Sequence, residues 1–328
     1  MKKLLITLLS LVVALGAAFF FLSTPDTDPA EMLAKYGGPQ SKFAAGPSGM
    51  KIHFRDQGNP DGRPIILIHG MSASLHTWEP LIDRLGGAFR VITYDQPAHG
   101  LTGAAPDNDY SARGMMRVLD AVAEAAGVEH FILGGNSMGG WVAWRYALAR
   151  PERVDALILL DAGGAPLREG EKPPPLNLGF RLSQSAPGRL LLRHFMPRSL
   201  IEKSIRETVA DESIVDDAMI DRYWELLRLP ANRRAAPYLF TADREPAMAA
   251  RLSEIAAPTL IVWGREDLLI YASAAETFHE RIPNSNVRVY DGVGHLPMVE
   301  APDKTADDIR RFLESLAPEI GDGAASAP

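Results

Sequence analysis

The chain has 328 residues, no cysteine and a formal net charge of −7 at pH 7. This length suffices for one large α/β domain with an insertion. The acidic balance excludes a nucleic-acid-binding surface, and the lack of cysteine excludes disulfides, a thiol nucleophile and acylation on cysteine. The sequence has neither the spacing of metal ligands nor a glycine-rich nucleotide loop, so no metal and no cofactor are expected.

The first element in chain order is an apolar run over residues 4–22, which contains no charged residue and follows Lys2 and Lys3. A helix of this length spans roughly 28 Å, close to the thickness of about 30 Å of a bilayer core. The alternative is a cleaved signal peptide, for which residues 16–18 offer a site of small residues. The apolar run continues beyond that site, and this favours a retained transmembrane anchor over residues 1–22.

The charges on either side of the anchor predict its orientation. Lysines precede it, whereas Asp26, Asp28 and Glu31 follow it, which places the N-terminus in the cytoplasm. We therefore expect a single-pass protein of the inner membrane, with the rest of the chain in the periplasm. Residues 23–48 contain four prolines and are interpreted as a polar juxtamembrane connector, in which residues 30–36 form two helical turns on the membrane.

Seven short apolar runs predict strands. They are residues 51–55, 64–68, 90–94, 130–134, 156–160, 259–263 and 287–290. The four central runs are continuously apolar, as is typical of parallel strands that are buried on both faces of a sheet. Helical patterns lie between the runs, and this alternation predicts an α/β fold with a mostly parallel, doubly wound sheet.

The interval 163–254 interrupts the alternation. It opens with prolines and then shows helical patterns without strands, at residues 189–196, 200–208, 216–227 and 247–255. We therefore expect the core to consist of residues 49–162 and 255–317, with the interval inserted between them. The last residues, 318–328, are expected to be disordered.

A serine lies at the turn that follows the fourth of these strands. The segment Gly135-Asn136-Ser137-Met138-Gly139 has the pattern G-x-S-x-G, and a helix-forming run comes after it. A strained turn needs small neighbours, which the glycines provide, so that the Ser137 hydroxyl stands exposed above the sheet. The alternative is a glycine-rich turn with a chance serine. The strand before it and the helix after it favour a nucleophile.

A serine nucleophile needs a base that takes its proton and an acid that orients the base. Asp267 comes just after the sixth strand, and His295 lies in a glycine-flanked loop after the seventh. Asp161, which follows the fifth strand, is the alternative acid. The order along the chain favours a catalytic triad of Ser137, Asp267 and His295.

Four segments together resemble the landmarks of the α/β-hydrolases. They are His69-Gly70-Met71-Ser72-Ala73-Ser74, Asp95-Gln96-Pro97-Ala98-His99-Gly100, Gly135-Asn136-Ser137-Met138-Gly139-Gly140 and Gly294-His295. The resemblance covers about residues 50 to 316, and within the superfamily the chain is most similar to bacterial membrane-anchored esterases and phospholipases A. It implies the α/β-hydrolase fold, in which residues 163–254 form a helical cap over the active site. The apolar side chains of residues 190–196 would line an acyl pocket or pack the cap on the core.

The resemblance also implies an oxyanion hole made by the backbone N–H groups of Met71 and Met138. His69 would brace the Met71 loop through hydrogen bonds rather than take part in the chemistry. One departure from the common pattern is Gln96-Pro97-Ala98, where many relatives carry a glycine before the His-Gly pair. This departure lies in a loop and leaves the triad untouched.

These features predict a membrane-anchored serine carboxylic-ester hydrolase with its catalytic domain in the periplasm. Its substrate would be a membrane lipid or another acyl ester, with phospholipase A or lysophospholipase as the particular activity. The lipid bilayer is the other expected partner, nucleic acid is not, and a homodimer stays open. Two alternatives remain. The nucleophile turn also resembles that of carbon–carbon bond hydrolases of aromatic ring-fission products, and a catalytically silent fold could serve as a scaffold.

Overall fold

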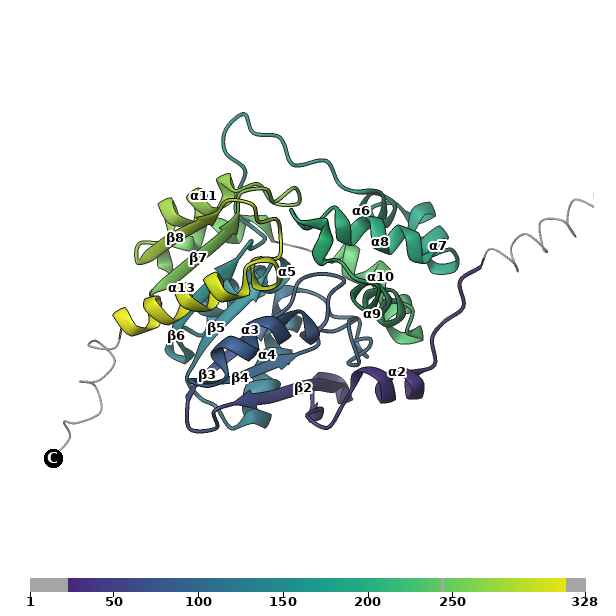
Figure 1. The fold of residues 1–328 in the computed structure, drawn as a ribbon, viewed down its shortest axis with the longest axis horizontal. Helices are drawn as coiled ribbons and strands as arrows, with labels where there is room; N and C mark the ends of the chain where they lie inside the picture. Colours follow the sequence, from purple (N-terminus) through teal and green to yellow (C-terminus); the bar gives the residue numbers. More distant parts are fainter. Residues whose placement is uncertain (1–22, 243–244, 317–328) are drawn as a thin grey trace, which may run out of the picture.

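The computed structural model describes residues 23–242 and 245–316, and its centre is a sheet of eight strands (Figure 1). The strands are β1 (Lys42–Ala45), β2 (Lys51–Gly58), β3 (Arg63–Ile68), β4 (Phe89–Tyr94), β5 (Phe131–Asn136), β6 (Val154–Leu160), β7 (Thr259–Gly264) and β8 (Ser285–Tyr290). Their order in the sheet is β1-β2-β4-β3-β5-β6-β7-β8. β2 pairs antiparallel with β1 and β4, and the remaining neighbours in this sheet pair parallel.

All seven predicted strands are present, and the mostly parallel α/β sheet is confirmed. The largest difference in their ends is at β2, which continues to Gly58. β1 was not predicted. It is an edge strand of four residues in which Ala44 alone is buried, so it carries no apolar alternation that a sequence pattern could reveal.

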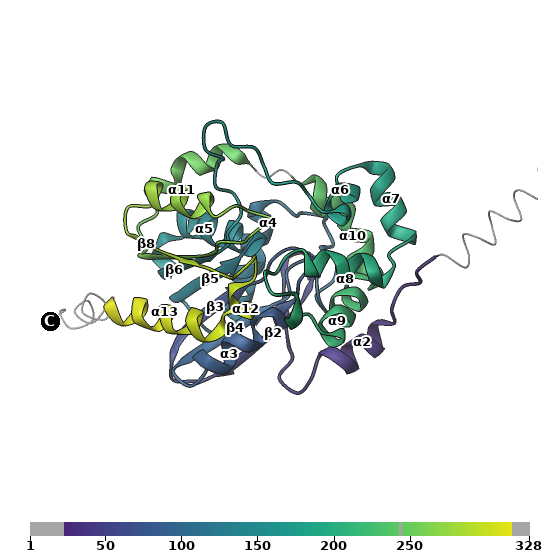
Figure 2. The same cartoon turned by 45° about the horizontal axis from the view of Figure 1, so that its top comes forward.

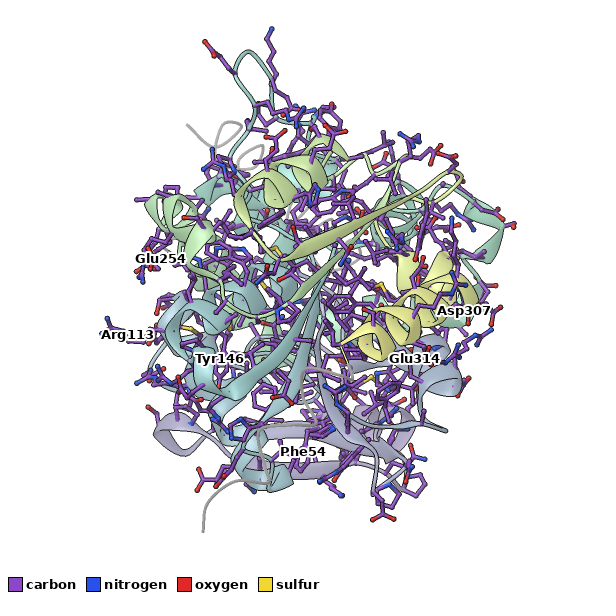
Figure 3. The ribbon with its side chains drawn as sticks, turned by 90° about the vertical axis from the view of Figure 1, so that its left-hand side faces the viewer. Phe54, Arg113, Tyr146, Glu254, Asp307 and Glu314 are labelled. Atoms are coloured by element: carbon purple, nitrogen blue, oxygen red, sulfur yellow. The ribbon has the colours of Figure 1, made fainter. Side chains whose placement is uncertain are left out.

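Helices cover both faces of the sheet. α3 (Glu79–Leu85), α12 (Pro297–Glu300) and α13 (Pro302–Ser315) pack on one face, and α4 (Ala112–Ala126), α5 (Met138–Ala149) and α11 (Ser273–Arg281) pack on the other. Figure 3 shows Tyr146 of α5 and Glu314 of α13 on opposite sides of the strands. This is the doubly wound arrangement that the alternation of strands and helices predicted.

The central strands are buried on both of their faces. Every residue of β5 and β7 is buried, because each face of the sheet packs against a layer of helices. Capping residues set the ends of the helices. α4, for example, begins after Ser111, whose side chain accepts the Gly114 N–H, and ends at Gly127, which has a φ of 66°. Short 3-10 helices complete the core, namely η1 (Pro47–Gly49), η2 (Leu75–Trp78) and η3 (Pro151–Arg153).

The insertion between β6 and β7 forms a helical cap to one side of the sheet (Figures 1 and 2). Its helices are α6 (Leu178–Ser183), α7 (Ala186–His194), α8 (Arg198–Arg206), η4 (Glu212–Ile214), α9 (Asp217–Leu227) and α10 (Pro230–Thr241). Three of the predicted helices correspond to α7, α8 and α9. The fourth is a 3-10 helix, η5 (Pro246–Glu254), rather than an α-helix. α6 was missed because it has only six residues, and α10 because Pro237 lies inside it.

The segment expected as a connector is built into the domain. β1 joins the sheet, and α2 (Pro29–Tyr36) packs on α9, where Met32 is buried beside Leu226 and Leu229 (Figure 1). The helix predicted here is therefore present, but its buried face meets the cap instead of a membrane. The predicted anchor, residues 1–22, and the predicted disordered tail lie outside the described residues. Among the helices that are described, none is both long enough and apolar enough to cross a bilayer.

Candidate active site

Ser137 lies at the turn between β5 and α5, with a φ of 53° and a ψ of −117°. Few residues other than glycine adopt such angles, and strain of this kind is typical of functional sites. The flanking glycines are required by space. A Cβ atom on Gly135 would overlap the carbonyl group of Gly139, and one on Gly139 would overlap the carbonyl oxygen of Ile68. The turn therefore has the geometry that a nucleophile elbow needs.

His295 and Asp267 are paired in the structure. The two side chains are buried, and His295 Nδ1 lies 2.7 Å from Asp267 Oδ2. The other carboxylate oxygen of Asp267 accepts the backbone N–H groups of Leu269 at 2.7 Å and Ile270 at 3.0 Å. A carboxylate held in this way accepts the Nδ1 proton, so that Nε2 of the neutral imidazole carries the lone pair of a general base.

Asp161, the alternative acid, lies close to this pair but is engaged differently. Its Oδ1 accepts the backbone N–H of Gly264 at 3.0 Å, and its own φ is 44°. Ligand atoms of Asp161, Asp267 and His295 lie within 4.8 Å of one another, the spacing of a metal site, yet Nδ1 of His295 and Oδ2 of Asp267 are already hydrogen-bonded to each other. Burial, followed by the charge of Asp267, raises the pKa of Asp161 well above its usual value. Asp161 therefore stays protonated beside the Asp267 carboxylate.

The loop that carries His295 is tied to the serine turn and to the cap. The side-chain amide of Asn136 donates hydrogen bonds to the main-chain oxygens of His295 at 3.0 Å and Leu160 at 3.2 Å. The backbone N–H of His295 donates to the Thr208 carbonyl of the cap at 2.8 Å. Asn136 is buried, and sequence reasoning missed its role, although it occupies the first variable position of the G-x-S-x-G pattern.

Glu300 holds the same loop from the other side. Its carboxylate accepts the backbone N–H groups of Gly294 at 2.9 Å and Leu296 at 3.1 Å, the two residues that flank His295. It also accepts the N–H of Ala210 from the cap at 2.7 Å. Sequence reasoning missed Glu300 as well. The one available signal was an acid five positions after the histidine, which is too common a pattern to interpret.

The loop after β3 packs against the serine turn. A Cβ atom on Gly70 would lie 2.9 Å from Asn136 Oδ1 and 3.1 Å from Ser137 Cβ, so only glycine permits this approach. Met71 lines the same cavity as Ser137, and Met138 is the first residue of α5. As the first residue of α5, Met138 has a backbone N–H that needs no partner within the helix. The oxyanion hole that the resemblance implies at these two residues stays a prediction.

Buried polar groups fix this loop. His69 Nδ1 donates to the Gly70 carbonyl at 2.7 Å, while its Nε2 accepts the Gln96 N–H at 3.0 Å. Burial lowers the pKa of His69, so the ring is neutral in this tautomer. His69 therefore braces the loop as expected. The carboxylate of Asp95 accepts the N–H of Leu75 at 2.8 Å, further along the same loop.

Asp95 is itself fully buried and paired. His53 Nδ1 lies 2.6 Å from its Oδ2, which also accepts the Leu101 N–H at 2.8 Å. Burial alone would raise the pKa of Asp95, but the hydrogen bond from His53 holds that pKa well below its usual value. A buried carboxylate thus joins β2 to the loops that follow β3 and β4.

The cavity at Ser137 has a volume of about 180 Å³, and His295 also lines it. Most of the remaining wall is apolar and comes from the cap, with Phe180, Leu192, Met196, Leu200, Ile201, Ile205 and Leu227. Within the apolar cluster predicted around α7, Leu192 and Met196 line this cavity, whereas Leu190 is 61% exposed and Leu191 is 46% exposed. The cluster is therefore divided between the cavity and the surface.

A serine on a strained turn of a mostly parallel sheet, with a buried histidine–aspartate pair beside it, defines a hydrolase of the α/β class. Residues 63–302 match the family described as the alpha/beta hydrolase fold, and the chain belongs to this family. The superfamily that the sequence motifs resembled is thereby confirmed.

Individual relatives are more distant. Lipase 3 of Moraxella sp. (strain TA144) is 28% identical over 275 residues, which cover 82% of this chain and 83% of that protein. The 2-hydroxy-6-oxo-6-phenylhexa-2,4-dienoate hydrolase of Burkholderia cepacia is 27% identical over 281 residues, which cover 80% of this chain and 92% of that protein. A solved structure of a membrane phospholipase A covers 97% of this chain and 99% of its own, with a TM-score of 0.70 and 24% identity, and it is similar in fold.

Proposed function

We propose that this protein is a membrane-anchored serine carboxylic-ester hydrolase that acts on acyl esters, in particular as a phospholipase A or lysophospholipase. The observation that carries the proposal is the cavity at Ser137, which His295 lines while it is hydrogen-bonded to Asp267. A nucleophile, a base and an acid beside an apolar space suit the cleavage of an acyl ester. The similarity to Lipase 3 supports an ester as the bond that is cleaved.

The reaction would begin with His295, whose Nδ1 proton is held by Asp267. Its Nε2 would take the Ser137 proton while Oγ attacks the ester carbonyl carbon. The backbone N–H groups of Met71 and Met138 would stabilise the oxyanion. Collapse of the intermediate would release the alcohol, protonated by His295, and leave an acyl-enzyme. Water activated by the same histidine would then release the acid.

The anchor belongs to the proposal because it bears on the substrate. Residues 1–22 would hold the catalytic domain at the periplasmic face of the inner membrane. An enzyme held close to a bilayer meets lipid at a high effective concentration. This favours lipid acyl esters over soluble ones as the natural substrates.

A carbon–carbon bond hydrolase of aromatic ring-fission products is the second candidate. The relative in Burkholderia cepacia carries the name of such an enzyme, and the nucleophile turn suits both chemistries. A membrane anchor is hard to rationalise for a soluble substrate, so the ester hydrolase ranks first. A catalytically silent scaffold ranks third, because a protein without catalytic activity does not account for the hydrogen-bonded His295–Asp267 pair beside Ser137.

The test uses the purified full-length protein in non-ionic detergent. It compares turnover of p-nitrophenyl butyrate, of a panel of phospholipids and lysophospholipids, and of a ring-fission dienone. A fluorophosphonate probe reports the reactive serine. We expect hydrolysis of the esters and labelling by the probe, and Ser137→Ala should abolish both. Cleavage of the dienone without ester hydrolysis would favour the second candidate, and the lack of both turnover and labelling would favour the scaffold.

A further inference from the structure

Arg233 of α10 is a buried cation whose hydrogen-bonding capacity is only partly used. The residue is 8% exposed. Its Nη1 donates to the Thr24 carbonyl at 2.7 Å and to Asp26 Oδ1 at 2.9 Å. Nε and Nη2 are also buried, and the described residues offer them no hydrogen-bond partner. Buried guanidinium groups are costly unless their donors are satisfied, so this side chain has open capacity for an acceptor.

The side chain that carries these open donors borders space that a ligand could fill. Arg233 lines the cavity at Ser137 and also a second, neighbouring cavity of about 330 Å³. Arg193 likewise lines both cavities and is exposed. The two arginines therefore lie where the apolar space beside Ser137 meets a polar space.

The charges around both cavities are unbalanced. Among the described residues, the lining of the Ser137 cavity includes three arginines, the third being Arg189, and no aspartate or glutamate. In the part of the chain that the structure describes, the charged or basic side chains that line the second cavity are Asp26, Arg193, His194, Arg233 and Arg234. The chain as a whole carries a net charge of −7, so this concentration of positive charge is local. Such a surface attracts an anion.

The chemistry of the donors narrows the class of anion. A guanidinium presents a planar fork that matches the oxygens of a phosphate or a carboxylate. The adjoining cavity wall is apolar and suits an acyl chain, with Leu192 and Met196 among its side chains. A ligand that fills both parts carries an apolar chain and an anionic group in one molecule.

We propose that Arg233, together with Arg193, binds the phosphate of a glycerophospholipid or lysophospholipid whose acyl chain lies along the apolar wall near Ser137. This inference rests on the proposed ester hydrolysis and deepens it, because it selects phosphate-bearing acyl esters over neutral glycerides. Asp26 accepts from Nη1 of the same guanidinium, so its carboxylate offsets part of the positive charge that would attract the phosphate. A carboxylate could use the same donors, so the test must separate the two anions.

The first experiment measures equilibrium binding to full-length Ser137→Ala protein in non-ionic detergent. The probes are a short-chain lysophosphatidylglycerol, the monoacylglycerol with the same chain and the free fatty acid of that chain. Arg233→Gln and Arg193→Gln should each weaken binding of the lysophospholipid on the order of tenfold, the loss of a charge-assisted hydrogen bond, and leave the monoacylglycerol unchanged. Arg181→Gln is the matched control, since Arg181 is exposed on α6 and lines neither cavity.

A second variant separates ligand binding from a structural role. Asp26→Asn removes the negative charge that offsets the guanidinium, while Arg233 keeps its bond to the Thr24 carbonyl. We expect tighter lysophospholipid binding, opposite in sign to Arg233→Gln. Three outcomes would overturn the proposal. They are weaker lysophospholipid binding in both Asp26→Asn and Arg233→Gln, equal losses of binding for all three probes, and no loss of binding in any variant. If Arg233→Gln and Arg193→Gln weaken binding of the fatty acid as much as binding of the lysophospholipid, the group that the arginines bind would be a carboxylate rather than a phosphate.

Turnover by the wild-type protein distinguishes this proposal from the proposed function. The ratio of kcat/KM for the lysophospholipid to that for the monoacylglycerol should fall on the order of tenfold in Arg233→Gln. Hydrolysis of both substrates with an unchanged ratio would overturn the phosphate site and leave the ester hydrolase standing. Arg233-dependent binding of the lysophospholipid without hydrolysis of any ester would support the phosphate site and overturn the proposed ester hydrolase.

Discussion

The side-chain amide of Asn136 donates a hydrogen bond of 3.0 Å to the main-chain oxygen of His295, although 159 positions separate the two residues. The same amide reaches the Leu160 carbonyl at the end of β6. Asn136 directly precedes the nucleophile, so one buried side chain links the serine turn to the loop that carries the base. The relative placement of Ser137 and His295 therefore depends on a residue that takes no part in the chemistry.

Asn136→Ala should lower kcat on the order of tenfold and leave KM for a small soluble ester nearly unchanged. The variant removes the Asn136 donor from the His295 carbonyl, which costs about 1–3 kcal/mol of unfolding free energy, and it frees the histidine loop. The Leu160 carbonyl keeps the hydrogen bond from the Ser137 N–H. Steady-state kinetics with p-nitrophenyl butyrate and urea unfolding measure the two effects. Asn284→Ala, at an exposed position before β8, is the control. A loss of stability with unchanged kcat would mean that Asn136 does not position the histidine.

Ser137→Ala and His295→Ala should each lower ester turnover by about three orders of magnitude or more, because members of a triad act as a unit. Neither change should unfold the protein. The serine side chain makes no cap bond at the start of α5, and the His295 loop keeps its backbone contacts to Thr208 and Glu300. Labelling with a fluorophosphonate should vanish in Ser137→Ala. Near-normal turnover by folded Ser137→Ala would exclude the serine mechanism.

Asp267→Asn should cripple turnover by about 10⁴, the loss expected when the residue that orients the base can no longer hold its tautomer. Asp161→Asn should have a small effect. Asp161 is already protonated, and asparagine keeps an oxygen for the Gly264 N–H. Separate measurements of kcat for the two variants, each with a check of its fold by circular dichroism, decide the assignment. A crippled Asp161→Asn beside an active Asp267→Asn would reverse it.

The candidate catalytic residues could be proposed from the sequence because they lie in the loops that follow the ends of strands. Each buried strand is a continuous apolar run, and a polar residue just past it stands out, as Asp267 and His295 do after β7 and β8. The glycines around Ser137 are equally easy to recognise in the sequence, because the close contacts within the turn leave no room for a Cβ atom. These signals are local, so one sequence was enough.

The residues that hold the site could not be predicted, because their partners are distant in sequence. Asn136 and Glu300 act through backbone groups of the histidine loop, and any residue type presents such groups. The burial of Arg233 depends on Thr24 and Asp26, more than 200 positions away. Ala98 is a case of another kind. Its φ of 69° is one that glycine adopts without strain, yet here alanine accepts it.

Stability should fall as the pH drops from about 6.5 toward 4, because two histidines are buried as neutral rings. Burial lowers the pKa of His69, and burial, which outweighs the opposing charge of Asp95, lowers the pKa of His76 to about 4. In the unfolded chain both would titrate near 6.5, so the unfolded state binds more protons in this window and stability is lost on acidification. The charged groups that act on His76 are Asp95, Arg55, Glu79 and Arg222.

Urea unfolding at pH 7.5, 6, 5 and 4 measures this loss. One pKa unit corresponds to about 1.4 kcal/mol, so His76 alone would remove on the order of 3 kcal/mol across the window. His76→Gln should flatten the pH profile, whereas His130→Gln, at an exposed position, should leave it unchanged. A profile that stays flat to pH 4 in the wild-type protein would contradict the neutral state of these rings.

The last prediction concerns the membrane, and the structure decides where the chain should be cut. Thr24 donates its N–H to the His194 carbonyl at 2.7 Å, and the Thr27 hydroxyl donates to the Glu225 carbonyl at 2.9 Å. Residues 23–27 therefore hold the cap, so a truncation designed to keep the cap should not extend beyond residue 22. A variant that lacks residues 1–27 should show a less stable cap in limited proteolysis than one that lacks residues 1–22.

The full-length protein should stay in the membrane fraction after high-salt and carbonate washing and should dissolve in detergent, because residues 4–22 bury enough apolar surface for essentially irreversible insertion. The variant without residues 1–22 should be released as a folded domain that cleaves p-nitrophenyl butyrate as well as the full-length protein, since no triad or oxyanion residue precedes Met71. Its activity on phospholipid vesicles should fall much further, because it loses the proximity to lipid that the anchor supplies. N-terminal sequencing of the mature protein should begin at or near Met1. A mature N-terminus near Phe19, with all activity in the soluble fraction, would identify the segment as a signal peptide and remove the main reason for preferring lipid substrates.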